Sequence, residues 1–199
     1  SVGECIFKLQ RTANDLFDGQ VNTGSVNTGG GWAGSIYTFE SIQADAYFEM
    51  DRGLFNLLDP NDVRFDVNVS PASVIDPNYE TSANPIATDR IIIAKYPGSE
   101  NQPLMNDIKV FRSSEMLFIV AEALAYEDDF DGVAVLLKQL RDARFGSGQP
   151  LLSLNNRQEA LAAILEEKRI EFAFEGHRYR DLKRIGVDAN RGIDRDLTD

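Results

Sequence analysis

The stretch that decides the fold is EEKRIEFAFEGHRYRDLKRIG, from Glu166 to Gly186. Twelve of its residues can carry charge, yet six apolar residues stand among them, two of them phenylalanines. Such a mixture fits three kinds of structure: an active site, a nucleic-acid patch or a buried structural network. The spacing of the residues helps to choose between them.

Three carboxylates in this stretch follow one another every four residues, at Glu167, Glu171 and Glu175. On a helix they form one acidic ridge. The apolar run at 172–174 means that nearly every side of this helix is partly buried, so some of the charges are desolvated and need partners. Arginine satisfies carboxylates with two-pronged hydrogen bonds. A second set places a base one turn from each acid: Arg178, Asp181 and Arg184. We therefore predict a structural charge network between two packed helices, in preference to the other two structures.

Helical patterns surround this stretch. Asn156 is a candidate N-cap with Glu159 at the third helical position, and that helix is predicted to run to about Glu175, with Gly176 ending it. A second helix follows to Gly186. Upstream, residues 107–127 and 130–144 repeat apolar residues at helical spacing and form an antiparallel hairpin. Two tandem hairpins suggest a TPR-like repeat.

The first half of the chain has no such pattern. We predict an irregular, partly β region over 1–105, the two hairpins over 106–186 and a polar tail over 187–199. Within the first region, ECIFKLQ near the start and residues 63–69 are predicted strands, and residues 90–96 are a predicted buried strand. Residues 19–34 contain VNTG twice and read as a loop, because Gly, Asn, Ser and Thr favour turns.

Composition excludes several kinds of site. The net charge of −12 disfavours binding to nucleic acid. With one cysteine, Cys5, no intramolecular disulfide is possible, and with one histidine, His177, the usual zinc ligand sets are out of reach. We expect no cofactor and no metal. An acidic cluster could attract Ca²⁺, but it lacks the ligand spacing of an EF-hand and reads better as a solvated helix–helix turn: Glu127, Asp128, Asp129 and Asp131.

The charged stretch also resembles the C-terminal signature of the RagB/SusD family. The positions that match are Glu167, Arg169, Glu171, Phe174, Glu175, Gly176, Arg178, Asp181, Leu182, Arg184 and Gly186. A second block, NDIKVFRSSEMLFIVAEAL at 106–124, resembles a helix of that family that carries an Arg, then a Glu, then Ala-Glu-Ala. CIFKLQR and DPNDVR (59–64) resemble weaker landmarks in the right order.

This resemblance implies a mainly α fold, in which TPR-like helical hairpins carry an irregular, partly β ligand-binding region. It implies a non-catalytic, lipid-anchored protein on the surface of the outer membrane of a Bacteroidota-type bacterium. Such proteins bind oligo- or polysaccharides, or other nutrients, and act with a SusC-like TonB-dependent transporter. In this setting the charged signature joins helices and does no chemistry. Because family members are longer, we expect the chain to correspond to a C-terminal portion.

Candidate ligand residues lie in the first region. Sugars bind to aromatic faces, with polar side chains on their hydroxyls. The best candidates are Trp32 and Tyr37, on or beside the glycine-rich loop, followed by Tyr47 and Asn27. Trp32, the only tryptophan, fits a core or interface position as well.

Other functions remain open from the residues alone. A TPR-like scaffold would bind a peptide in the concave face of the hairpins instead of near Trp32. A glycoside hydrolase needs only two carboxylates, but no spacing selects a pair. A Ser–His–Asp triad would need His177, which stands inside the structural signature.

Overall fold

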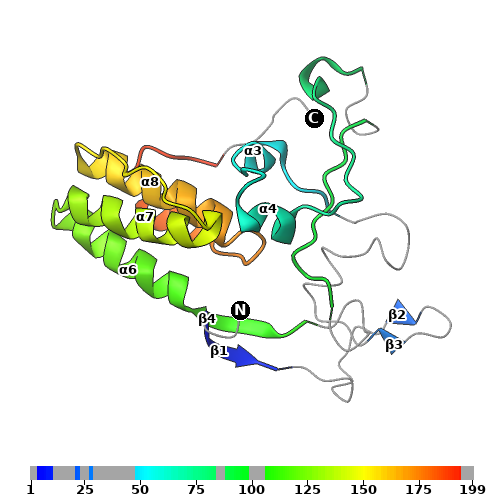
Figure 1. The fold of residues 1–199 in the computed structure, drawn as a ribbon, viewed down its shortest axis with the longest axis horizontal. Coiled ribbons are helices and arrows are strands. Elements are labelled where there is room, and N and C mark those ends of the chain that lie inside the picture. Colours follow the sequence, from blue (N-terminus) through cyan, green and yellow to red (C-terminus); the bar gives the residue numbers. More distant parts are fainter. Residues whose placement is uncertain are drawn as a thin grey trace. The chain divides into compact units, whose positions relative to one another are not determined.

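The computed structural model describes residues 4–10, 21–22, 27–28, 48–83, 88–98 and 106–193. The chain divides into two compact units. The helical unit contains residues 1–4, 57–64 and 112–199, and the second unit contains residues 5–56 and 65–111. The predicted mainly α fold is confirmed (Figure 1).

Four helices build the helical unit: α6 (Ser113–Tyr126), α7 (Phe130–Phe145), α8 (Arg157–Glu171) and α9 (Arg178–Ile185). Helices α6 and α7 form the predicted antiparallel hairpin, and α8 packs against both, as the green and yellow ribbons of Figure 1 show. At the hairpin turn, the Asp129 carboxylate accepts a hydrogen bond from the Gly132 amide and starts α7. Gly146, with a φ of 64°, ends α7 in the left-handed conformation.

The core of the helical unit lies between α6, α7, α8 and the turns that follow α8 and α9. Phe172 meets Phe118 edge to face, with 5.4 Å between the ring centroids. Each fully buried large aliphatic or aromatic side chain contributes about 1.5–3 kcal/mol to folding. The buried residues of this core cluster are Phe118, Ala121, Ala125, Val133, Leu137, Leu140, Ala160, Leu161, Ile164, Leu165, Phe172, Ile185 and Ala189.

Helix α8 begins as predicted, because the Asn156 side chain accepts a hydrogen bond from the Glu159 amide at 2.9 Å. It ends at Glu171, four residues before the predicted end at Glu175. Phe174 has a φ of 63° and Gly176 a φ of 81°, so the chain turns over residues 172–176 before α9 begins. Glu175 is therefore not on the same helix as Glu167 and Glu171, and the prediction of one helical acidic ridge is wrong at its last member.

The predicted helix over 107–127 is wrong in its first residues, which form strand β4 (Ile108–Arg112). Strand β4 pairs with β1 (Cys5–Leu9), the strand predicted from ECIFKLQ. Ile108 and Val110 are β-branched and alternate with Lys109, and this pattern favours a strand. Arg112 remains extended and serves as the N-cap residue of α6, and its amide donates to the Glu115 carboxylate at 3.1 Å.

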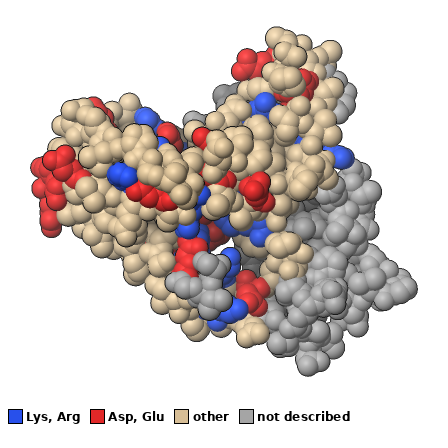
Figure 2. Space-filling model, in the orientation of Figure 1, with Lys and Arg blue, Asp and Glu red and all other residues tan. Residues whose placement is uncertain are grey.

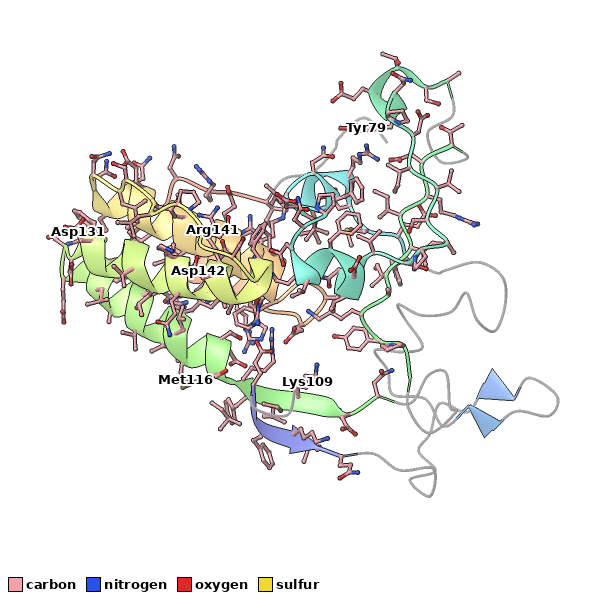
Figure 3. All side chains as sticks on the ribbon, in the orientation of Figure 1. Tyr79, Lys109, Met116, Asp131, Arg141 and Asp142 are labelled. Carbon is pink, nitrogen blue, oxygen red and sulfur yellow. The ribbon has the colours of Figure 1, made fainter. Side chains whose placement is uncertain are left out.

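The second unit has short elements. Strands β2 (Val21–Asn22) and β3 (Asn27–Thr28) pair antiparallel, so the predicted loop at 19–34 contains a short strand pair. Helix α3 (Arg52–Phe55) and the 3-10 helix η1 (Tyr79–Thr81) complete it. Figure 3 labels Tyr79, whose ring centroid lies 4.2 Å from the Arg52 guanidinium.

The strand predicted over residues 63–69 is wrong, because Val63–Asn68 forms helix α4. The Asp62 carboxylate accepts a hydrogen bond from the Arg64 amide at 2.8 Å, which is an N-cap that the alternating valines concealed. Residues 91–93 are buried, as predicted for 90–96. Instead of a regular strand, this segment forms isolated β-bridges: Arg90 to Val74, Ile92 to Glu49 and Ile93 to Val69.

Candidate functional site

The predicted ligand residues fall mostly outside the part of the chain that the structure describes. Trp32, Tyr37 and Tyr47 lie outside the described residues. Asn27 lies in strand β3, one residue from the end of the β2–β3 connection. The four residues therefore remain predictions, and the described chemistry of the chain lies in the charged signature and its surroundings.

Glu171, at the end of α8, is the centre of the network that we call the Glu171 cluster: Glu171, Arg64, Arg112 and Arg144. The Glu171 side chain is 1% exposed. One of its oxygens accepts from Arg144 at 2.7 Å and from Arg112 at 3.0 Å. The other accepts from Arg144 at 3.0 Å and from Arg64 at 3.3 Å. Three guanidinium groups thus share one buried carboxylate.

The electrostatics follow from this geometry. Burial alone would raise the pKa of Glu171, but the Arg144 hydrogen bonds and the charges of the three arginines lower it to about 2. The pKa of Arg144 is raised, because its bonds to Glu171 and Glu4 outweigh its burial. Glu171 and Arg144 are therefore charged at neutral pH, and neither is available as a general acid or base.

Arg112 joins the cluster to the turn after α8. It donates to the Glu171 carbonyl at 2.9 Å and to the Glu175 carboxylate at 2.9 and 3.2 Å. Its guanidinium also lies 4.9 Å from the centroid of the Phe172 ring. Glu175 thus remains a partner of the cluster although it has left the helix.

Arg64 joins the cluster to the start of α4. Its guanidinium forks onto Asp62, at 2.6 Å for the shortest contact, and lies 2.7 Å from the Glu167 carboxylate. Burial raises the pKa of Glu167 in spite of the neighbouring charges of Arg64 and Arg141. As the pH falls, Glu167 consequently takes up a proton before Glu171 does.

A second network, the Lys168 cluster, contains Lys168, Glu122, Asp181 and Arg184. The buried Lys168 ammonium donates to Asp181 at 2.6 Å and to Glu122 at 3.1 Å, so it joins α8, α9 and α6. Arg184 donates to both carboxylates from the outer side. Burial alone would raise the pKa of Glu122, but the hydrogen bonds from Arg184 and Lys168 outweigh it, so the pKa lies below its usual value.

The remaining signature residues lie in the turn after α8 and on the helices beside it. Arg178 donates to the Leu165 carbonyl at 3.3 Å, Gly176 supplies the positive φ and Arg169 is half-buried on α8. The His177 ring stacks on Phe172, with 4.5 Å between the centroids, and its burial lowers the pKa of the imidazole. The histidine considered for a triad therefore packs within the signature.

The acidic cluster at the α6–α7 turn has structural partners. Asp128 pairs with Arg157 at 2.9 Å and Asp129 caps α7. Figure 2 shows these acids as a red group at the left end of the helices. Within the described ranges no group of three or more His, Cys, Asp or Glu residues could hold a metal ion.

The predicted structural charge network is present, but the partners of Glu171 lie outside the two helices that were predicted to form it. The predicted pairing of α8 with α9 is present at Lys168–Asp181. The partners of Glu171, however, come from α4, β4 and α7, far from it in sequence. Two of these partners, Arg64 and Arg112, lie in DPNDVR and KVFRSSE, which the sequence analysis noted as family landmarks. Nothing in those segments indicated that their arginines pair with Glu171.

An apolar groove of about 470 Å³ lies on the helical unit, between the first half of α6 and the second half of α7. Figure 3 labels Met116 on the α6 side. The residues that line the groove are Ser113, Ser114, Met116, Leu117, Val120, Leu136, Gln139, Leu140, Ala143 and Arg144.

Comparison with known proteins shows which family the chain belongs to. The sequence profile of the SusD family matches residues 66–196, which contain every member of both clusters except Arg64. The chain belongs to the SusD family. The resemblance read from the charged signature is thereby confirmed.

Several relatives support this membership. The SusD-like protein P38 of Formosa agariphila is 31% identical over 115 residues, which are 53% of this chain and 23% of that protein. A SusD superfamily protein from Bacteroides fragilis has the same fold, with a TM-score of 0.65 and 21% identity over 91% of this chain and 40% of its own. A SusD-like carbohydrate binding protein from Bacteroides vulgatus has a TM-score of 0.54 and 25% identity over 71% of this chain and 28% of its own.

The SusD-family chain thus spans less than half the length of these relatives. Among the residues that the structure describes, none of the helices is long and apolar enough to cross a membrane. In this chain, charged side chains of the family signature form ion pairs that join α8 to α4, β4, α6, α7 and α9.

Proposed function

We propose that this chain forms the carbohydrate-binding part of a SusD-type protein and binds an oligo- or polysaccharide without cleaving it. The observation that carries the proposal is the match to the SusD family over residues 66–196. A solved relative from Bacteroides vulgatus, 25% identical, is a SusD-like carbohydrate binding protein, and this name supports a glycan as the ligand class.

The side-chain chemistry supports binding without turnover. A glycoside hydrolase needs two carboxylates that can exchange protons at a glycosidic bond. The buried carboxylates of the signature are instead committed to guanidinium or ammonium partners, with Glu171 held at a pKa of about 2. In this proposal the signature carries the binding region and does not touch the ligand.

We place the glycan at the aromatic residues of the first region, Trp32 and Tyr37, with Asn27 and Tyr47 beside them. Indole and phenol rings stack on the C–H faces of pyranose rings, and the asparagine amide can bond to sugar hydroxyls. The bound glycan would pass to a SusC-like TonB-dependent transporter at the surface of the outer membrane, where a lipid anchor on a longer protein would hold the complex.

The test uses Trp32, the only tryptophan of the chain. Tryptophan fluorescence is followed while the protein is titrated with α-glucans, xylans, pectic oligosaccharides and mucin oligosaccharides. We expect a saturable change with one class. Isothermal titration calorimetry with that class should then lose its signal in Trp32→Ala and keep it in the matched control Tyr179→Ala, because Tyr179 is an exposed tyrosine of α9.

Two results would contradict the proposal. Release of reducing ends from the bound glycan would indicate an enzyme. Calorimetry without binding to any glycan class, in a protein whose circular dichroism shows the folded helices, would remove carbohydrate binding from this chain.

A further inference from the structure

Glu167 is a buried carboxylate beside the Glu171 cluster whose charge is poorly compensated. Its side chain is 11% exposed. The Arg64 Nη1 atom lies 2.7 Å from its Oε1 atom, but this buried oxygen accepts no aligned hydrogen bond from the described residues. Arg141, which Figure 3 labels on α7, has its Nε atom 3.8 Å from Oε2, too far for a hydrogen bond. One turn along the same helix, Glu171 accepts hydrogen bonds from three arginines.

Arg64 has to serve three carboxylates at once. Its Nε and Nη2 atoms donate to Asp62 at distances between 2.6 and 3.0 Å. Its Nη1 atom donates to Glu171 at 3.3 Å and lies 2.7 Å from Glu167. Two carboxylates therefore approach the same nitrogen, and like charges that share a site oppose each other's ionisation. Of the two, Glu171 has other arginines to hold its charge, and Glu167 has the weaker set of partners.

A proton on Glu167 relieves this conflict. A neutral carboxyl keeps an acceptor oxygen for Arg64 and gains a donor. Burial raises the pKa of Glu167, and this effect exceeds the opposing charges of Arg64 and Arg141. Because the folded pKa lies above the unfolded value, the stabilisation that this proton gives is complete below the unfolded pKa of 4.5 and is lost as the pH rises through the folded pKa. This sign is opposite to that of Glu171.

The position of Arg64 in the chain gives this proton a structural consequence. The chain leaves the helical unit immediately after Arg64, and α4 continues from Arg64 into the insertion 65–111. That insertion and residues 5–56 together form the second unit, which contains the proposed glycan residues. A weakly held contact at the end of a segment allows local opening there, and a stronger contact suppresses it.

We infer that Glu167 is a proton-binding latch: a proton on its carboxyl strengthens the hold on Arg64 and fixes the start of the insertion 65–111, and loss of the proton relaxes this hold. The consequence for binding rests on the proposed function. An ordered insertion favours the glycan complex, so affinity for the glycan should rise as the pH falls, and bound glycan should in turn raise the affinity of Glu167 for the proton. The charged groups that face Glu167 are Arg64 and Asp62 at the start of α4, Arg141 on α7 and Glu171 on α8.

The test first measures the proton and the latch without any ligand. An NMR titration of the chain with ¹³C-labelled glutamate side chains gives a midpoint for each carboxyl, and the Glu167 signal is the one that Glu167→Gln removes. We expect this midpoint above 4.5. Amide exchange over residues 62–68, corrected for its intrinsic dependence on pH, should slow at least about threefold between about pH 7 and about pH 5, as a shift of half a pKa unit gives.

The variants separate Glu167 from the other acids. Glu167→Gln imitates the protonated carboxyl, so exchange over residues 62–68 should be slow at both pH values. The matched control Glu166→Gln, an exposed position on the same helix, should behave like the parent. A Glu167 midpoint at or below 4.5, or faster exchange in Glu167→Gln than in the parent at about pH 7, overturns the inference whether or not the chain binds a glycan.

Calorimetry with the glycan class that binds then tests the coupling. We expect the affinity of the parent to be at least about threefold higher at about pH 5 than at about pH 7, and that of Glu167→Gln to be equal at both. The same dependence on pH in the parent and in Glu167→Gln overturns the coupling to binding. A chain that binds no glycan contradicts the proposed function, while the titration and the exchange still decide the latch.

Discussion

The replacement of Glu171 by glutamine should destabilise the helical unit strongly. Glutamine keeps the size of the side chain and one acceptor oxygen, but it removes the charge and points a donor at guanidinium donors. The pKa of Glu171 lies at about 2 instead of the ordinary 4.5. This difference of about 2.5 pKa units, at about 1.4 kcal/mol each, makes the ionised form roughly 3–4 kcal/mol more favourable in the folded state. The loss of one partner of a buried pair typically costs a similar amount, about 3–5 kcal/mol.

The assay is urea unfolding at pH 7, followed by far-UV circular dichroism. We expect Glu171→Gln to lower the free energy of unfolding by about 3 kcal/mol and the midpoint temperature by roughly 6–12 °C. The matched control is Glu166→Gln, on the exposed side of the same helix, which should stay within about 0.5 kcal/mol of the parent protein.

The dependence on pH gives a second, independent measurement. Because the folded pKa of Glu171 lies below the unfolded value, its stabilisation is complete above the unfolded pKa of 4.5 and fades as the pH falls towards about 2. The difference in stability between the parent and Glu171→Gln should therefore shrink in this window. A difference below about 1 kcal/mol at pH 7, or one that does not change with pH, would refute the argument for an ionised, stabilising centre.

Three further changes test the local structure of the signature. Phe172→Ala should lower the free energy of unfolding in urea by about 3–5 kcal/mol, because the ring packs on Phe118 and His177. The control Tyr179→Ala, at an exposed position, should lower it by less than about 0.5 kcal/mol. Equal losses would show that the Phe172 ring is not part of the core. Gly176→Ala should cost about 1 kcal/mol because its φ is 81°, whereas Gly148→Ala, at an open position without a positive φ, should be close to neutral, and a reversed order would contradict the assigned turn. Asn156→Ala should cost about 1 kcal/mol by removal of the α8 cap, and amide exchange at Glu159 should rise with it; unchanged exchange there would argue against the cap.

The helices were predictable because their signals are local. The N-cap of α8, the apolar spacing of α7 and the glycine after the charged turn can each be read within a few residues. The errors occurred where two local patterns competed and the more obvious one did not decide the structure. The β-branched residues 108 and 110 formed a strand inside an apparent helix, and the Asp62 cap turned an alternating segment into helix α4.

The charge network was predictable only in part, for a physical reason. Its presence follows from the need of buried carboxylates for cations, which any sequence with this composition must meet. Its partners follow from chain topology, because Arg64 is 107 residues and Arg112 is 59 residues from Glu171. A periodicity argument reaches only one or two helical turns, so it pairs α8 with its neighbour α9 and overlooks distant arginines.

The positions of those distant partners explain what the network can contribute to binding. The second unit consists of two insertions, residues 5–56 and 65–111, between segments of the helical unit. Glu4 immediately precedes the first insertion, Arg64 precedes the second, and Arg112 follows the second. Arg64 and Arg112 pair with Glu171. Glu4 pairs with Arg144 of the same cluster. Three of the four points at which the chain leaves or re-enters the helical unit are therefore held by the network centred on Glu171. A binding region built on loops needs its ends fixed by a rigid scaffold. Under the proposed function, the family signature would affect ligand binding only through the anchoring of these ends.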